Sequence, residues 1–335
     1  MNARILIAFM ALLACSSLYA GLNDKPPGRQ ENGFGSTETY IASSYETVRM
    51  GSASQGDKLW YYVPDQLKYG DSAPTIIFLH GFSALFPYVY RSHIEHLLFQ
   101  GNIVIFPQFQ KSSLWGFLNE SGILSPADQN IWAQRAVDSA NGALNDLGSR
   151  VASNEIYLYG HSLGGLIALA WQAHGGQPVQ GIMLSHPQVD SSAGMPAFVA
   201  AFVKIEEIPW RDYVGDIDVP VVILNGDEDT IAPISQSEEI LAGLTSSPHA
   251  QLYVAQGDDY GRPRISPNHG APLDAIFGLP PHLKIFGISG EMNMLDWRYY
   301  FAGLDGFMWE PTGELEFDLG QWSDGTEVLP VLRID

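Results

Sequence analysis

The chain has 335 residues and a formal net charge of −20 at pH 7. Phosphate backbones and anionic membrane surfaces repel a protein this acidic, so nucleic acid is excluded as an expected partner. Hydrophobic residues make up 46% of the chain and aromatic residues 12%. This share is enough for a sizeable core and excludes a disordered chain.

The first twenty residues have the pattern of a secretion signal. Arg4 precedes an apolar run over residues 5–14, which is too short to span a bilayer. Cleavage after Ala20 would release a soluble periplasmic or secreted protein. Alternatively, the lipobox-like run LLAC ends at Cys15, which would then carry a lipid anchor. Cys15 is the only cysteine, so the exported protein is expected to have no disulfide.

The remainder divides into an arm and one α/β domain. Residues 21–45 are rich in Gly, Pro, Ser, Asn and Thr, which is typical of a linker or a loosely held arm. Within residues 46–335, short apolar runs alternate with segments of helical spacing. The expected strands are 58–63, 75–79, 102–106, 155–159, 181–184, 219–224 and 251–254. The expected helices are 88–100, 126–147, 163–173, 235–244 and 294–304. This alternation predicts a mainly parallel sheet with helices on both faces.

The helix over 126–147 has a predicted start. Ser125 fits an N-cap, Pro126 the first helical position and Asp128 the third. The helix is expected to end before Gly148.

A G-x-S-x-G motif indicates a nucleophile. Gly160-His161-Ser162-Leu163-Gly164 follows an expected strand and opens an expected helix, which is the setting that this motif needs. The two outer glycines would remove Cβ atoms that clash with the neighbouring strand and helix. The N–H of Leu163, at the start of the helix, can help to bind an oxyanion.

A second oxyanion donor is expected after the strand 75–79, in His80-Gly81-Phe82. Gly81 lets the chain turn close to the site, and Phe82 would offer its backbone N–H. The side chain of His80 is expected to brace this loop rather than to transfer protons.

The acid and the base should follow Ser162 in the chain. Asp229 is favoured as the acid, because Gly226-x-x-Asp229 follows the strand 219–224 and lets the chain turn back; Asp227 and Asp190 are the alternatives. Three histidines lie beyond Asp229. His269 is favoured as the base, because it follows the strand 251–254, whereas His249 precedes that strand and His282 follows two prolines in a peripheral segment.

These motifs together resemble those of bacterial α/β-hydrolases, in particular small esterases of the dienelactone-hydrolase, cutinase and platelet-activating-factor-acetylhydrolase type. The resemblance covers about residues 58–310 and rests on four motifs. They are His80-Gly81-Phe82, Gly160-His161-Ser162-Leu163-Gly164-Gly165, Gly226-x-x-Asp229 and Asn268-His269-Gly270.

The resemblance implies a role for each matched residue. Ser162 is implied as the nucleophile, His269 as the base and Asp229 as its partner, with the Phe82 and Leu163 N–H groups at the oxyanion. It also implies no metal and no organic cofactor. His93-Ile94-Glu95-His96 lacks the order and spacing of a zinc-protease helix and is expected to be a helix face.

The favoured function is the hydrolysis of carboxylic esters through an acyl-enzyme on Ser162. An amidase or peptidase on the same fold, or a non-catalytic surface binding protein, are the alternatives. Epoxide hydrolases and dehalogenases are disfavoured, because they need Asp in place of Ser162.

Aromatic residues are candidates for substrate binding or for packing. Phe86 and Tyr88 follow the oxyanion loop, and Trp115 and Phe117 lie in the insertion 111–124. The segment 186–216 between two strands is short, so no large lid is expected. Small to medium esters are therefore favoured over long-chain fats.

Overall fold

The computed structural model describes residues 24–120, 122, 125–191, 204–274 and 290–334. The predicted signal, with Cys15 and the cleavage site after Ala20, is outside these ranges. So are His282 and much of the short segment in which no lid is expected.

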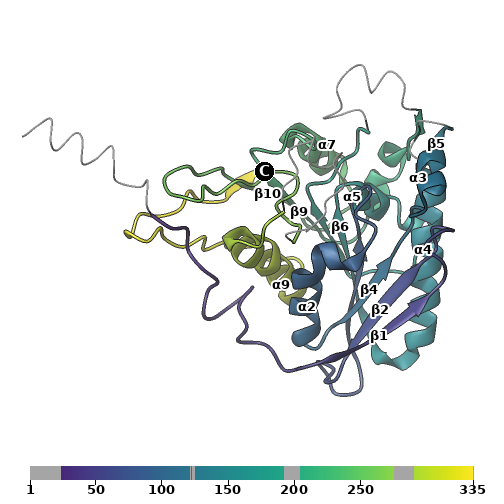
Figure 1. Ribbon diagram of the computed structural model, residues 1–335, viewed down its shortest axis with the longest axis horizontal. Coiled ribbons are helices and arrows are strands. Elements are labelled where there is room, and N and C mark those ends of the chain that lie inside the picture. Colours follow the sequence, from purple (N-terminus) through teal and green to yellow (C-terminus); the bar gives the residue numbers. More distant parts are fainter. Residues whose placement is uncertain (1–23, 121, 123–124, 192–203, 275–289, 335) are drawn as a thin grey trace, which may run out of the picture.

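A central mixed sheet organises the described residues. Its nine strands are β1 (Tyr45–Met50), β2 (Leu59–Pro64), β3 (Ala73–Leu79), β4 (Ile103–Pro107), β6 (Val151–His161), β7 (Gly181–Ser185), β9 (Val221–Gly226), β10 (Ala250–Ala255) and β11 (Leu332–Ile334). The order is β1-β2-β4-β3-β6-β7-β9-β10-β11 (Figure 1). The six strands from β4 to β10 are parallel, and antiparallel strands flank them. The predicted fold class is confirmed.

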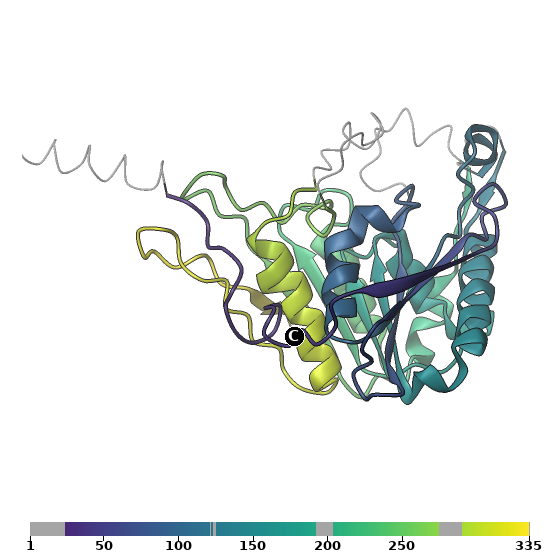
Figure 2. The same ribbon diagram turned by 60° about the horizontal axis from the view of Figure 1, so that its bottom comes forward.

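Helices cover both faces of the sheet and separate two hydrophobic clusters. One face packs against α4 (Gln129–Leu147), α5 (Leu163–Leu169) and α7 (Ile234–Gly243). The other packs against α2 (Arg91–Phe99), the π-helix η6 (Asp296–Phe301) and α9 (Ala302–Trp309), and α2 and α9 lie side by side (Figures 1 and 2). The parallel strands are apolar along nearly their whole length because both faces are covered.

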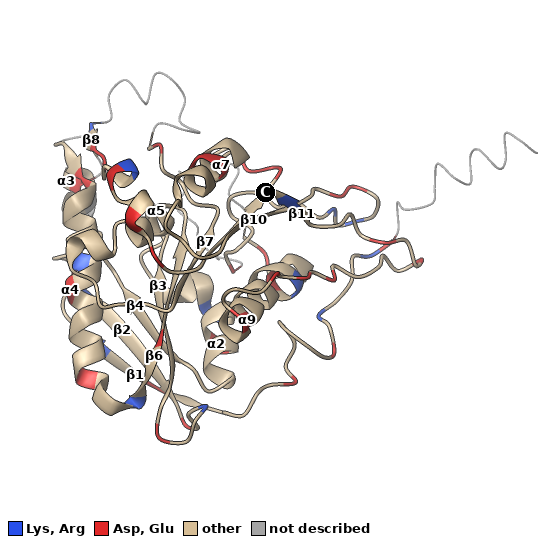
Figure 3. Cartoon of the chain, turned by 180° about the vertical axis from the view of Figure 1, so that it is seen from behind, with Lys and Arg blue, Asp and Glu red and all other residues tan. Residues whose placement is uncertain are grey.

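Smaller elements complete the fold. They include the 3-10 turn η1 (Pro87–Tyr90), the helix α3 (Leu114–Glu120) and the short strands β5 (Ala127–Asp128) and β8 (Ile205–Glu206). Four further 3-10 turns among the described residues are η2 (Gly148–Arg150), η3 (Gln172–His174), η4 (Trp210–Asp212) and η5 (Val214–Asp216). None of the described helices combines the length and the apolar character needed to cross a bilayer. Acidic side chains are spread over helices and loops (Figure 3).

The helix start predicted at Ser125 is wrong. α4 begins at Gln129, and Asp128 is its N-cap, because the Asp128 carboxylate accepts a hydrogen bond from the Asn130 N–H at 2.9 Å. Ala127 and Asp128 are extended and pair with β8. Pairing with a distant strand therefore overrides the local capping pattern.

Both edges of the sheet carry strands that the sequence did not predict. No residue of β1 or β11 is fully buried, and both strands lack the continuous apolar run of the inner strands. The tail before β11 is anchored by Trp322, which is 2% exposed and donates its indole N–H to Asp258.

The arm, residues 24–44, has no helix or strand but is tied to the domain. The Gly35 N–H donates to the Asp305 carboxylate at 2.7 Å, and the Ile41 N–H donates to the Phe99 carbonyl at 2.8 Å. The arm therefore contacts both α2 and α9.

His93 is packed in the core beneath α2. Its ring stacks on Phe301 at 4.4 Å and meets Tyr159 edge-on at 4.9 Å, and neither ring nitrogen has a hydrogen-bond partner among the described residues. Burial holds the pKa of His93 well below its usual value, so the ring is neutral. His93 therefore lowers the stability of the fold on acidification.

We predict that His93→Phe weakens the acid sensitivity of the fold. Below about pH 6.5 the unfolded chain binds a proton at His93 that the folded chain does not, so stability falls as the pH falls. As the pH falls through this window, the free energy of unfolding of the variant should fall by about 1.4 kcal/mol less per pH unit than that of the wild-type protein. Denaturant unfolding at pH 7.5, 6.0 and 5.0 measures the difference. If the free energy of unfolding depends on pH in the same way in both proteins, His93 titrates equally in the folded and the unfolded chain.

Candidate active site

The candidate nucleophile Ser162 lies in the turn between β6 and α5. Its backbone has φ 56° and ψ −120°, a conformation that L-residues rarely adopt and that is concentrated at functional sites. The Ser162 N–H donates to the Ser185 carbonyl at 3.0 Å, which ties the turn to the end of β7. The strained turn projects the side chain beyond the carboxyl edge of the sheet.

Gly160 and Gly164 make this turn possible. A Cβ on Gly160 would lie 2.5 Å from the Gly164 carbonyl oxygen, and a Cβ on Gly164 would lie 2.1 Å from the Leu79 carbonyl oxygen. These clashes with the following helix and the neighbouring strand confirm the steric role predicted for the two glycines.

The loop after β3 lies against the nucleophile. A Cβ on Gly81 would be 3.2 Å from the Ser162 Cβ, and the Gly81 N–H donates to the Tyr90 hydroxyl at 2.9 Å. His80 is fully buried, donates from Nδ1 to the Gly81 carbonyl at 2.8 Å and stacks on Phe109. Burial lowers the pKa of His80 to about 3, so it braces the loop as a neutral ring, as predicted.

The two predicted oxyanion donors belong to the segments that flank Ser162. Phe82 follows Gly81 in the loop after β3, and Leu163 is the first residue of α5. The first N–H groups of a helix have no acceptor within it, which suits Leu163 for this task. Their role at an oxyanion remains a prediction.

The structure brings Ser162, His269 and Asp229 together. The His269 Nδ1–H donates to the Asp229 Oδ2 at 2.8 Å, because an ionised carboxylate can only accept. The His269 Nε2 is therefore unprotonated and accepts from the Ser162 hydroxyl at 2.8 Å. The three side chains form a continuous chain of hydrogen bonds from carboxylate to serine.

The Asp229 carboxylate is buried and accepts four hydrogen bonds. Oδ1 accepts the N–H groups of Ile231 and Ala232, each at 2.8 Å. Oδ2 accepts from His269 at 2.8 Å and from His186 at 2.7 Å. Burial alone would raise the pKa of Asp229, but the electrostatic interactions and hydrogen bonds with His269 and His186 outweigh burial and hold the pKa well below its usual range. Asp229 is therefore ionised.

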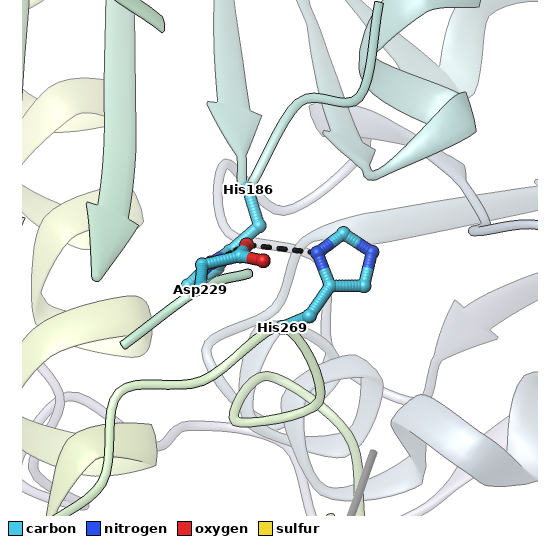
Figure 4. Close-up of side chains that lie close together, drawn as sticks. All are labelled: His186, Asp229 and His269. Atoms are coloured by element: carbon cyan, nitrogen blue, oxygen red, sulfur yellow. Dashed lines mark hydrogen bonds and ion pairs between the residues drawn. The ribbon is translucent and has the colours of Figure 1, made fainter. Parts of the chain in front are cut away.

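His186 and Tyr300 were not predicted from the sequence. His186 follows β7 and lies beside Asp229, as Figure 4 shows together with His269. The His186 Nε2 accepts from the Tyr300 hydroxyl at 2.8 Å. The position of His186 at the end of an expected strand was a signal that could have found it. Tyr300 has no such signal, because it lies in a helix far along the chain.

His161 connects three parts of the site. Its Nε2–H donates to the His269 carbonyl at 3.0 Å, so Nδ1 accepts from the Tyr90 hydroxyl at 2.8 Å. Tyr90 in turn accepts the Gly81 N–H. Burial lowers the pKa of His161 well below its usual value, so the ring stays neutral. The turn at Ser162 is thereby fixed to the loops of Gly81 and His269.

The other candidates for the acid and the base lie away from Ser162. Asp190 is exposed, and Asp227 is exposed and accepts the Gly257 N–H at 2.7 Å. His249 precedes β10, at the opposite end of the sheet, and its Nε2 is 3.1 Å from the Gly313 carbonyl.

The aromatic candidates separate into two places. Phe86 and Tyr88 are stacked and line a cavity of about 310 Å³ together with Trp60 and other side chains of β1, β2 and α2. The triad residues are not among its lining. Trp115 lies on α3 and is 71% exposed. Phe117 is also on α3, but its side chain is outside the described part.

His186, Asp229 and His269 are the one group of the described residues with metal-binding side chains this close together. The two His nitrogens lie 2.7 and 2.8 Å from the Asp229 Oδ2. Atoms that share one zinc ion, with bonds of about 2.0 Å, lie roughly 3.3 Å apart. The spacing therefore fits shared protons rather than a shared metal ion.

A family model described as serine aminopeptidase, S33 (Hydrolase_4) matches residues 132–213, which include the G-x-S-x-G motif and His186. The strand order, the strained serine after β6 and this match all point to the same fold. The protein has the α/β-hydrolase fold. No curated protein matches its sequence.

Three solved structures are similar to this protein. Acylaminoacyl peptidase from Pyrococcus horikoshii is 13% identical, with a TM-score of 0.49 over 69% of this chain and 38% of that one. Est1E from Butyrivibrio proteoclasticus is 17% identical, with a TM-score of 0.46 over 72% of this chain and 95% of that one. Esterase Pf2001 from Pyrococcus furiosus is 18% identical, with a TM-score of 0.46 over 70% of this chain and 90% of that one. The chain thus spans little more than a third of the peptidase's length.

We predict that Gly164→Ala destabilises the protein, because its Cβ would lie 2.1 Å from the Leu79 carbonyl oxygen. Overpacking of this kind costs about 1–3 kcal/mol or more. The matched control is Gly142→Ala within α4, where a Cβ meets nothing within 4 Å, so the better helix former should stabilise by about 0.5–1 kcal/mol. Denaturant unfolding of both variants measures the contrast. Equal effects would contradict the steric account of the turn.

Proposed function

We propose that this protein is an exported serine hydrolase that cleaves carboxylic esters through an acyl-enzyme on Ser162. The hydrogen-bond chain from Asp229 through His269 to Ser162 is the observation that carries this proposal. A serine hydroxyl is a weak nucleophile unless a base removes its proton, and His269 is placed to do so.

The proposed reaction has two halves. His269 takes the Ser162 proton as the oxygen attacks the ester carbonyl, and ionised Asp229 stabilises the imidazolium that forms. The N–H groups of Phe82 and Leu163 bind the tetrahedral oxyanion. The alcohol leaves with the proton from His269, and water then releases the acid by the reverse sequence of proton transfers.

A peptidase or amidase is the second candidate. The family match to serine aminopeptidases over residues 132–213 is the observation that favours it. The same triad chemistry serves esters and amides, so the substrate pocket decides between them. A direct comparison of matched ester and anilide substrates distinguishes the two.

The cavity at Phe86 and Tyr88 is proposed to take an extended arm of the substrate. Trp60 in its wall belongs to β2, and two strands, β4 and β3, separate β2 from β6 and its Ser162. At about 4.8 Å between strands, the cavity is offset sideways across the sheet by roughly 14 Å from Ser162. Short acyl groups would not reach it, whereas medium-length arms would.

We predict that Ser162→Ala abolishes hydrolysis of p-nitrophenyl esters and labelling by a fluorophosphonate. The loss in kcat/KM should be roughly 10⁴-fold or more, because the variant has no nucleophile. Ser247→Ala, before β10 at the other end of the sheet, is the matched control and should retain activity. Faster turnover of aminoacyl p-nitroanilides than of esters would replace the esterase proposal by the peptidase. A folded protein that turns over neither and resists the label would refute both.

We further predict that Tyr88→Ala changes the chain-length preference. Tyr88 is 56% exposed at the cavity and contributes apolar contact to a long arm. The variant should lower kcat/KM for p-nitrophenyl decanoate roughly five- to tenfold and leave the acetate unchanged. Trp309→Ala removes another exposed aromatic side chain, at the end of α9 and outside the cavity lining, and is the control. An unchanged profile in Tyr88→Ala would exclude the cavity from substrate binding.

A further inference from the structure

We propose that His186 and Tyr300 form a positioning pair that holds the catalytic carboxylate of Asp229 in place for His269. This inference rests on the proposed function and concerns the same site. His186 touches neither Ser162 nor the expected oxyanion donors through any hydrogen bond of the described residues, so it would act through Asp229.

The hydrogen bonds of the pair have one consistent direction. Asp229 only accepts, so the His186 Nδ1 carries a proton and donates at 2.7 Å. The His186 Nε2 is then unprotonated and accepts from the Tyr300 hydroxyl at 2.8 Å. Tyr300 therefore selects the tautomer of His186 that can donate to the acid.

Both members of the pair are buried and uncharged. Burial lowers the pKa of His186 and raises the pKa of Tyr300 well above its usual value. The His186 ring is thus a neutral donor that stabilises the carboxylate without competing with His269 as a cation. A charged partner in this place would weaken the attraction between Asp229 and the imidazolium of His269.

Unusual backbone at two separate places supports the pair. His186 has φ 49°, a left-handed conformation that is rare outside glycine, and its N–H donates to the Leu224 carbonyl at 2.8 Å. Tyr300 lies in the π-helix η6, a form that is frequent at functional sites. Its neighbour Tyr299 donates to the carbonyls of Asn225 and Tyr253, which anchors η6 to the ends of β9 and β10.

The pair also sets the environment of the base. His186 and His269 donate to the same oxygen of Asp229, so removal of one donor leaves more negative charge for the other. The imidazolium form of His269 would then be favoured. The other titratable groups that face this cluster are His161 from the nucleophile turn, Tyr90 from η1, Tyr159 from β6, and Tyr299 and Asp296 from η6.

The test compares His186→Leu, which removes the donor, with His186→Asn, whose amide can donate near the position of Nδ1. For His186→Leu we expect kcat on a p-nitrophenyl ester to fall roughly 10- to 100-fold with KM nearly unchanged. The acid limb of the kcat/KM profile should move to higher pH. His186→Asn should restore most of the lost rate. Tyr300→Phe should show the same changes in weaker form, because His186 is then free to adopt either tautomer.

His93→Leu is the matched control, since it removes another buried histidine from the same core face and should leave the rate and the pH profile unchanged. Fluorophosphonate labelling of Ser162 and unfolding midpoints show which variants are folded. If His186→Leu misfolds, the kcat and the acid limb of Tyr300→Phe test the positioning role instead. A folded variant with the wild-type kcat and acid limb would overturn the positioning role, whereas an inactive wild-type protein would refute the proposed function instead.

Discussion

The site depends on keeping one carboxylate ionised away from water. A buried charge is costly unless hydrogen bonds replace its hydration. Asp229 meets this requirement with four N–H donors, two from the backbone of its own loop and two from histidine rings. The donors come from the loops that follow β7, β9 and β10, so the carboxyl ends of these strands must meet at one point. The parallel sheet supplies that meeting point, because its strands all end at the same edge.

Strain is concentrated at this edge and regular structure surrounds it. Ser162 and His186 have left-handed backbone at the ends of adjacent strands, and η6 is a π-helix above them. Strain of this kind persists only where neighbouring packing determines the conformation. Here the rings of His80, His161 and His186 are buried, and each hydrogen-bonds a loop that carries the chemistry. Fixed tautomers, rather than mobile charges, thus orient His269 and Ser162.

Much of the fold could be predicted because its signals are local. The inner strands are covered on both faces and are therefore continuous apolar runs. The edge strands β1 and β11 have no such run, since one side of each is open to solvent. The start of α4 was misplaced because the Ser125 pattern satisfies a local rule, while Ala127 and Asp128 pair with β8, far along the chain.

The sequence by itself determined the order and identity of the residues at the proposed reacting centre. Ser162 is marked by glycines that its turn requires, and Asp229 and His269 follow strands in the expected order, so each carries a signal within a few residues. Only the tertiary structure decided which groups support them. His186 meets Asp229 across 43 positions and Tyr300 across 114, and a hydrogen bond over such distances leaves no periodic trace in the chain. It exists because the sheet and η6 bring separate segments to one edge.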